Sequence, residues 1–141
     1  MGYSENVLYP GVAEALHSLR RKGVAIGLCT SKRVDFADKI LSMFGLRDLF
    51  AFIDGGDVGV QKWQQVAGLM ARDRISRASV MIGDRSVDLI AAHRNGMCSA
   101  GVTWGHGSRQ ELLDECPQYL LDTPAELDAI DWSSSPTRPY A

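Results

Sequence analysis

Two aspartates, Asp84 and Asp88, lie four residues apart in the stretch GDRSVD, which follows a short apolar run. Four residues are about one turn of a helix, so both carboxylates can face one point. Two hard oxygen ligands at the open end of a strand suit Mg²⁺, which usually takes one or two carboxylates plus waters and a phosphate. Acidic residues also favour helix N-termini because of the helix dipole, and the residues alone leave both interpretations open.

Three further polar residues have groups that could contact a phosphate. Thr30 and Ser31 follow another apolar run, where a hydroxyl and free backbone N–H groups can hold phosphate oxygens or can cap the next helix. Lys62 lies at the start of a predicted helix, where the helix dipole disfavours a cation. This position favours a functional role such as meeting a phosphate, although a solvated lysine is the commoner alternative.

Other candidates have weaker signals. His106 lies between two glycines in a loop that follows a predicted strand, where a histidine is more often solvated than functional. Asp54 and Asp57 follow a different strand, but an Asp-Gly-Gly-Asp stretch is more often explained by turn formation.

Helical and strand patterns alternate along the chain and must position these residues. The patterns predict strands at Val24–Cys29, Phe50–Ile53, Ser79–Ile82, Cys98–Val102 and Tyr119–Leu121. They predict helices at Pro10–Lys22, Arg33–Phe44, Gln61–Arg72 and Val87–Arg94, and two more that open at Ser108 and Thr123. Such alternation indicates an α/β fold, a doubly wound parallel sheet that binds ligands beyond the carboxyl ends of its strands.

The composition is that of a single globular domain. The chain has 141 residues, with 15 Lys+Arg against 17 Asp+Glu, a balance that argues against a nucleic-acid partner. No apolar run approaches the roughly 20 residues of a membrane span, and no signal peptide is recognisable at the start. The three cysteines are widely spaced and indicate neither a disulfide framework nor a zinc site, so we expect a reducing cytoplasm. We expect a core over 1–130 and a mobile Ser/Pro-rich tail over 131–141.

The order of the motifs resembles that of the haloacid dehalogenase-like (HAD) phosphatases, particularly the phosphoglycolate phosphatase-like branch. The resemblance runs through nearly the whole chain and includes the segments Leu8–Lys32 and Ile82–Leu112, the second of which contains a TWG-x-G loop. It implies a Rossmann-like core, a Mg²⁺ cofactor and small phosphorylated metabolites as substrates. It further implies that Thr30 and Ser31 bind the phosphoryl oxygens and that Lys62 offsets their charge. Asp84 would coordinate Mg²⁺, and Asp88 would hold the metal or its waters.

One part of the family pattern is missing. The first motif of the family is an Asp-x-Asp pair whose first aspartate is the nucleophile, and residues 1–29 contain no aspartate. The helical cap of the family is missing too. The sequence therefore resembles the carboxyl-terminal part of such an enzyme, and we expect the isolated chain to be inactive. The alternatives are a non-catalytic, degenerate domain, or a receiver-type signalling domain, in which the acceptor aspartate comes early and the lysine late, against the order seen here.

The missing motif also has a structural consequence. In the family, the strand of the first motif is the central one, between the strands that correspond here to Val24–Cys29 and Ser79–Ile82. Its loss would leave two bare strand edges, and each buried unpaired backbone group would cost about 1–3 kcal/mol. We therefore expect the gap to be filled, either by a segment from a second copy in a homodimer or by the two edge strands closing together.

Overall fold

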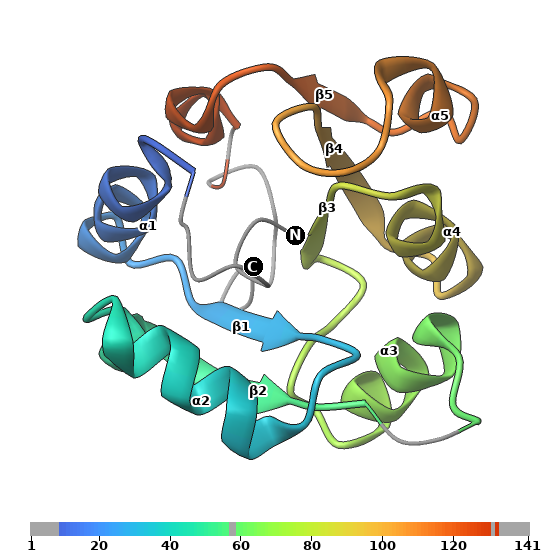
Figure 1. Ribbon diagram of the computed structural model, residues 1–141. Helices are drawn as coiled ribbons and strands as arrows, with labels where there is room; N and C mark the ends of the chain where they lie inside the picture. The colour runs from blue at the N-terminus through green and yellow to red at the C-terminus, as the bar shows by residue number, and fades with distance from the viewer. Residues whose placement is uncertain (1–8, 57–58, 131, 133–141) are drawn as a thin grey trace.

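The computed structural model describes residues 9–56, 59–130 and 132 of the chain. Helices and strands alternate within this part, and the helices surround the strands (Figure 1). The strands are β1 (Ile26–Cys29), β2 (Phe50–Asp54), β3 (Val80–Gly83), β4 (Cys98–Val102) and β5 (Tyr119–Leu121). The helices are α1 (Val12–Arg21), α2 (Val34–Met43), α3 (Lys62–Ala71), α4 (Ser86–Arg94) and α5 (Arg109–Leu113), with 3-10 helices η2 (Arg47–Leu49) and η3 (Pro124–Ala129).

Every predicted strand and helix is present, and the local start and stop signals explain several of the boundaries. Gly23 follows α1 with φ of +83°, the left-handed conformation that glycine adopts without strain. Before α5, the hydroxyl of Ser108 accepts a hydrogen bond from the Glu111 N–H at 3.0 Å. Before η3, Glu126 Oε1 accepts one from the Thr123 N–H at 2.9 Å. Capping signals therefore mark both helix starts, and the second of these helices is of the 3-10 type.

Within the described residues, the strands form two sheets, and every pairing between them is parallel. β1 pairs with β2, with Cys29 opposite Asp54. The second sheet has the order β3-β4-β5, with Gly83 opposite Gly101. Paired parallel strands end at the same edge of a sheet, so the loops that follow them lie side by side. The predicted α/β fold with parallel strands is therefore confirmed, and the sheet is split in two.

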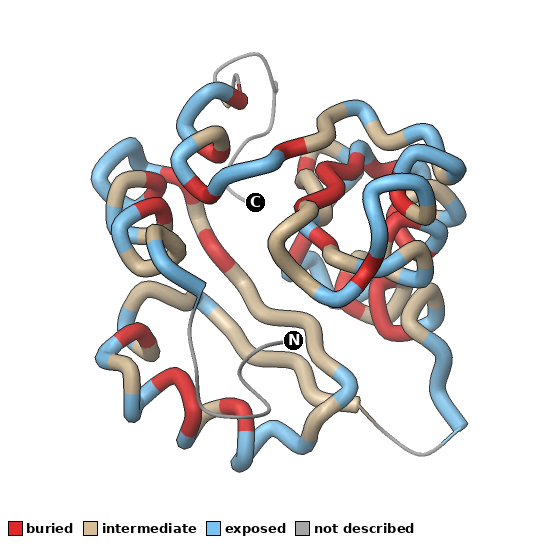
Figure 2. Tube along the Cα trace, turned by 45° about the horizontal axis from the view of Figure 1, so that its top comes forward, coloured by how far each residue is buried: buried red, intermediate tan, exposed pale blue. Residues whose placement is uncertain are grey.

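Two hydrophobic clusters pack against the strands. The α1 cluster consists of Ala15, Leu19, Val24, Ile26, Ala100, Val102, Leu121, Leu127 and Ile130. The α3 cluster consists of Val66, Leu69, Ile75, Ala91, Ala92 and Met97. Neighbouring residues of one strand point to opposite faces, and Val80 packs against the α1 cluster while Met81 packs against the α3 cluster. The clusters therefore cover opposite faces, and Figure 2 shows buried stretches alternating with exposed ones along the helices.

Each cluster involves side chains from both sheets. The α1 cluster joins Ile26 of β1 to Ala100 of β4, and Cys29 and Met81 of β1 and β3 both pack against the α3 cluster. β1 and β3 are the edges that face each other in Figure 1, and they belong to different sheets. The expectation that these two edges close together is therefore wrong, because closure would require both shared clusters to repack. The other expectation, that a segment from a second copy of the chain fills the gap between β1 and β3, stays a prediction.

The end of the chain is described only in part. Of the tail predicted to be mobile, 131 and 133–141 lie outside the described residues, and Trp132 donates its indole N–H to the carbonyl oxygen of Leu127 at 3.2 Å. In the part of the chain that is described, no helix combines the length and apolar character needed to span a membrane.

Candidate functional site

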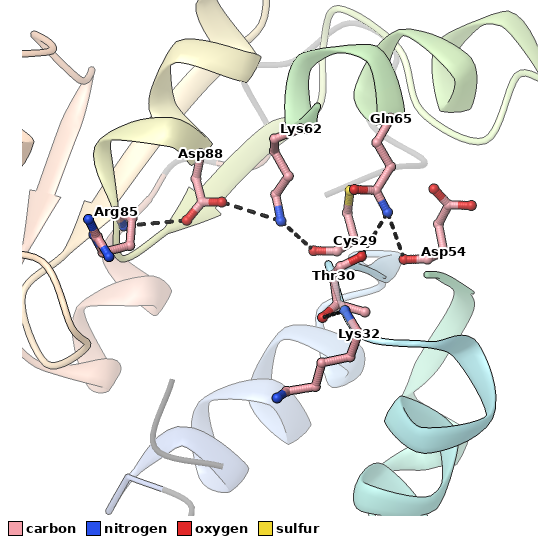
Figure 3. Close-up of polar contacts among 8 residues, drawn as sticks. All are labelled: Cys29, Thr30, Lys32, Asp54, Lys62, Gln65, Arg85 and Asp88. Atoms are coloured by element: carbon pink, nitrogen blue, oxygen red, sulfur yellow. Dashed lines mark hydrogen bonds and ion pairs between the residues drawn. The ribbon is translucent and has the colours of Figure 1, made fainter. Parts of the chain in front are cut away.

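Lys62, the first residue of α3, contacts one group at the end of β1 and one in the helix that follows β3, so it bridges the two sheets (Figure 3). Its Nζ atom donates to the carbonyl oxygen of Cys29, at the end of β1, at 3.0 Å. The same atom lies 3.4 Å from Oδ1 of Asp88 in the first turn of α4, and the two side chains are only 16% and 13% exposed. A carbonyl and a carboxylate therefore offset the unfavourable position of this lysine in the dipole of α3.

The residues after β1 form a turn with unused donors. The N–H of Thr30 extends the β1–β2 pairing by donating to the carbonyl oxygen of Asp54 at 3.0 Å, and its Oγ1 accepts from the Lys32 N–H at 3.1 Å. α2 begins at Val34 without a side-chain cap, so the hydroxyl of Thr30 stabilises the turn itself. Among the described residues, neither the N–H nor the hydroxyl of Ser31 has a hydrogen-bond partner. The turn thus has free donors of the kind that bind anions.

Gln65 is a residue of this site that the sequence analysis missed. It is 9% exposed, and its Nε2 donates to the carbonyl oxygens of Thr30 at 2.9 Å and Asp54 at 3.0 Å (Figure 3). Its only signal in the sequence is the spacing from Lys62, three residues earlier, which places both side chains on the same face of α3. Together the two side chains bind three carbonyl oxygens at the ends of β1 and β2.

Asp88 both pairs with Lys62 and caps its own helix. Its Oδ2 accepts from the N–H of Arg85 at 3.3 Å, while Oδ1 faces Lys62. Gly83 allows this approach, because a Cβ atom at that position would lie 2.3 Å from the Cβ of Asp88. The capping role that the sequence left open for Asp88 is therefore present, and both of its oxygens have protein partners.

Asp84 is held by the loop that follows β4. Its Oδ2 accepts from the backbone N–H of His106 at 3.0 Å, and its carbonyl oxygen accepts from the N–H of Gly107 at 2.9 Å. A Cβ atom at Gly105 would overlap the Asp84 side chain, and one at Gly107 would overlap its carbonyl oxygen. The glycines that surround His106 are therefore needed for this close approach, and His106 contributes its backbone to the contact.

The side chain of Glu111, a residue of α5, binds backbone and side-chain donors at the N-terminus of α4. Its Oε2 accepts from the Ser86 N–H at 2.8 Å and from Nε of Arg85 at 2.9 Å. The Ser86 N–H is the largest cause, and Arg85 the next, of a shift that lowers the pKa of Glu111 to about 2. Because Glu111 and Asp88 satisfy the first N–H groups of this helix, Asp84 is not needed as a helix cap.

Cys29 lies within the site but is poorly suited to act as a nucleophile. Burial raises the pKa of its thiol to about 11, the carboxylates of Asp54 and Asp88 act in the same direction, and Lys62 opposes them. The thiol is protonated at neutral pH, whereas nucleophilic cysteines react as thiolates.

The acidic residues form no complete metal site within the described residues. In the described part of the chain, no group of three or more His, Cys, Asp or Glu side chains could hold a metal ion. Within that part, Oδ1 of Asp84 has no hydrogen-bond partner, whereas Oδ2 of Asp88 accepts from the Arg85 N–H and its Oδ1 is ion-paired with Lys62. One or two carboxylates are sufficient for Mg²⁺ when waters and phosphate oxygens supply its other ligands. Asp84 therefore offers a cation one carboxylate oxygen without a protein partner in the described part of the chain, whereas Asp88 would have to exchange a partner to join it.

The predicted site residues are brought together to different degrees. Lys62 contacts Asp88 directly, and the Thr30 turn joins them through the backbone of Cys29 and through Gln65. Asp84 lies in the connection between β3 and α4, four residues before Asp88 in the first turn of α4, and Asp57 lies outside the described residues. A depression of about 750 Å³ is lined by residues in and next to α2, η2 and the end of β2 and by none of the five predicted site residues.

Comparison with known protein families gives one clear match. The model of the family described as "Haloacid dehalogenase-like hydrolase" matches residues 4–102. The phosphoglycolate phosphatase of Synechococcus elongatus is 36% identical over 121 residues, which are 85% of this chain and 57% of the relative. That of Colwellia psychrerythraea is 33% identical over 127 residues, 87% of this chain and 56% of the relative. The chain therefore spans about half the length of the curated relatives it matches.

Solved structures with similar folds agree with this match. A predicted phosphatase from Clostridium acetobutylicum superposes with a TM-score of 0.79 at 33% identity, covering 86% of this chain and 58% of that one. A predicted phosphoglycolate phosphatase from Haemophilus somnus superposes with a TM-score of 0.77 at 25% identity, covering 90% of this chain and 60% of that one. The two described sheets therefore adopt an arrangement seen in longer proteins of this kind.

Proposed function

The chain belongs to the haloacid dehalogenase-like hydrolase family, and from this membership we propose that it carries the phosphate- and metal-binding part of a Mg²⁺-dependent phosphatase. The substrates are small phosphorylated metabolites, as in the phosphoglycolate phosphatases that it resembles. The observation that supports this most directly is the double contact of Lys62 Nζ, with the Cys29 carbonyl oxygen at 3.0 Å and with Asp88 at 3.4 Å. These contacts join a cation to the end of β1 and to Asp88 in the first turn after β3, and the carboxyl ends of strands are where α/β proteins bind ligands.

The proposed roles follow from the chemistry of each group. Thr30 and Ser31 bind the phosphoryl oxygens through the hydroxyls and the free N–H of the turn, and Lys62 offsets their negative charge. Asp84 and Asp88 hold Mg²⁺ or its waters, and a bound Mg²⁺ supplies further positive charge toward the phosphoryl group. Phosphoryl transfer depends mainly on positioning and charge stabilisation, which are the contributions these residues offer.

We propose that the isolated chain binds these ligands without turnover. The nucleophile of the family is the first aspartate of an Asp-x-Asp motif, and residues 1–29 contain no aspartate to act as one. A non-catalytic binding domain is therefore the second candidate function, and the absence of this aspartate favours it. Because the chain belongs to the hydrolase family, we do not propose the receiver-type signalling domain as its function.

We also propose that the middle of the sheet, the position of the family's first-motif strand, is completed by a segment from a second copy. β1 and β3 face each other and, among the described residues, pair with β2 and β4 and not with each other, and Ile82 of β3 is 36% exposed. A strand inserted between them would cover this apolar side chain and satisfy the edge groups. Sedimentation equilibrium should then show a dimer that Ile82→Lys weakens, whereas a monomer at all concentrations would contradict the proposal.

The compartment proposed is the reducing cytoplasm. Cys29, Cys98 and Cys116 are all free thiols in the structure, and a reducing compartment keeps cysteines in this form.

The binding function can be tested on the chain itself by titrating it with inorganic phosphate, with and without Mg²⁺, in a calorimeter. We expect saturable binding that Mg²⁺ strengthens and that Thr30→Val or Asp84→Asn weakens. Ser42→Ala, which removes a hydroxyl from the exposed side of α2, should bind as the wild type does. An absence of phosphate binding would contradict the proposed site.

Catalysis is tested separately with p-nitrophenyl phosphate and Mg²⁺. We expect no turnover by the isolated chain. Turnover that Asp84→Asn abolishes would establish a phosphatase and would contradict the second candidate function.

A further inference from the structure

The side-chain amide of Gln65 binds the last residues of the β1–β2 pairing. Nε2 has two hydrogens, and both are used, toward the carbonyl oxygens of Thr30 at 2.9 Å and Asp54 at 3.0 Å. The Asp54 oxygen also accepts the N–H of Thr30 at 3.0 Å. Gln65 is 9% exposed, so these bonds are formed largely away from water. Its amide therefore holds the first peptide of the turn from the α3 side (Figure 3).

The contact of Gln65 with the Thr30 carbonyl oxygen also fixes the direction of the Ser31 N–H, because both groups belong to one planar peptide bond. The Thr30–Ser31 bond is trans, so its C=O and its N–H point in opposite directions. Because Gln65 holds the C=O of Thr30, the N–H of Ser31 points away from α3. That N–H has no hydrogen-bond partner among the described residues, whereas the next one along, that of Lys32, is used by Thr30 Oγ1.

We infer that Gln65 is a positioning residue that holds the Ser31 N–H toward the phosphoryl oxygens. The inference rests on the phosphate-binding role proposed above for the turn after β1. Gln65 acts through the peptide plane and does not touch the anion itself. It also has an electrostatic effect, because its donors and Lys62 offset the partial negative charges of three carbonyl oxygens that would repel an anion nearby.

The test follows the backbone amide of Ser31 by ¹H–¹⁵N NMR while the full chain is titrated with sulfate. Sulfate stays a dianion over the pH range used, which keeps the probe constant. In the wild type, the Ser31 signal should move with saturation. In Gln65→Leu we expect sulfate to bind at least about fivefold more weakly, as for the loss of one hydrogen bond, and the Ser31 shift to shrink. Gln64→Leu is the matched control, because this glutamine lies in the same turn of α3 and its Oε1 accepts from the Gln61 N–H at 2.8 Å, with no hydrogen bond to the turn after β1 among the described residues.

A second variant separates positioning from a general loss of structure. Gln65→Glu presents a carboxylate that can only accept, so it should bind sulfate as weakly as Gln65→Leu at about pH 7. Protonation restores one O–H donor, so its affinity relative to that of the wild type at the same pH should recover as the pH falls toward about 4.5. Gln65→Leu has no group to protonate and should show no such recovery.

The outcomes are distinguishable. Equal sulfate affinity and equal Ser31 shifts in the wild type and Gln65→Leu would overturn the inference and leave the proposed function intact. Equal weakening in Gln64→Leu, or no recovery of Gln65→Glu at low pH, would also overturn it. If sulfate moves neither Thr30 nor Ser31 in the wild type, the phosphate-binding role itself fails, and the positioning role fails with it.

Discussion

Nζ of Lys62 lies 3.4 Å from Oδ1 of Asp88, and this ion pair links the first turns of α3 and α4, which follow strands of different sheets. Both side chains are mostly buried, and each has one further partner, the Cys29 carbonyl oxygen for Lys62 and the Arg85 N–H for Asp88. The ion pair therefore holds the start of α3 and the start of α4 together, although no hydrogen bonds join β1 to β3 in the described part of the chain.

Lys62→Met should destabilise the fold. The change leaves the largely buried Asp88 carboxylate with the Arg85 N–H alone, and we expect the free energy of unfolding to fall by about 1–3 kcal/mol. Urea unfolding followed by circular dichroism measures this loss. Lys39→Met, at an exposed position of α2, should change stability by less than about 0.5 kcal/mol. Equal stability of both variants would show that the ion pair contributes nothing to folding.

Gly107→Ala should also destabilise the fold. The added Cβ atom would lie 2.2 Å from the carbonyl oxygen of Asp84, where the Gly107 N–H now donates at 2.9 Å. We expect a loss of about 1–3 kcal/mol in thermal or urea unfolding, as for overpacking at a tight contact. Gly68→Ala is the matched control, because a Cβ atom there meets nothing within 4 Å and an alanine inside α3 should stabilise by about 0.5–1 kcal/mol. A neutral Gly107→Ala would mean that the loop does not hold Asp84 as described.

The stability contributed by Glu111 should depend on pH. Its pKa in the folded state, lowered to about 2, lies below the unfolded value of about 4.3, so the ionised carboxylate favours folding above that value. Glu111→Gln should be less stable than the wild type at about pH 7, and the two should converge as the pH falls from about 4.5 toward about 2. The measurement is the free energy of unfolding against pH. A stability difference between Glu111→Gln and the wild type that stays constant over this pH range would contradict the contribution of the ionised carboxylate.

The three thiols should react at different rates with a disulfide reagent at about pH 8. Cys98 and Cys116 are exposed, whereas burial and nearby carboxylates raise the pKa of Cys29 to about 11. We therefore expect two fast thiols and one slow one in the folded chain, and three fast thiols in urea. Cys29→Ala should remove only the slow phase. Three equal rates in the folded chain would contradict the burial of Cys29.

The elements of the fold could be predicted because their signals are local. Gly23 ends α1, and Ser108 begins α5 through a contact with the third residue after it. The bare edges of β1 and β3 were indicated only by the resemblance to a family that has a strand between them, and local signals could not show that these edges stay apart. Their separation accompanies packing between residues far apart in the sequence, such as Ile26 and Ala100, which share one cluster.

The candidate site was predictable where chemistry-bearing side chains follow strands. Thr30 and Asp84 stand out for this reason, and Lys62 stands out because the helix dipole disfavours it. Gln65 could not be found in this way, since its partners are backbone carbonyl oxygens that carry no mark in the sequence. The contact between Gly107 and Asp84 was hidden for a similar reason, because it joins backbone groups of two loops.

The sharing of both hydrophobic clusters between the two sheets bears on how the chain unfolds. Hydrogen bonding alone would divide the molecule into a two-stranded and a three-stranded unit. Neither unit keeps a complete core when the other is removed, because Ile26 packs with Ala100 on one face and Cys29 and Met81 flank the same helices on the other. Cooperativity in this protein is therefore set by its side chains, and the native state should melt as one unit in a single transition despite the break in its backbone hydrogen bonding.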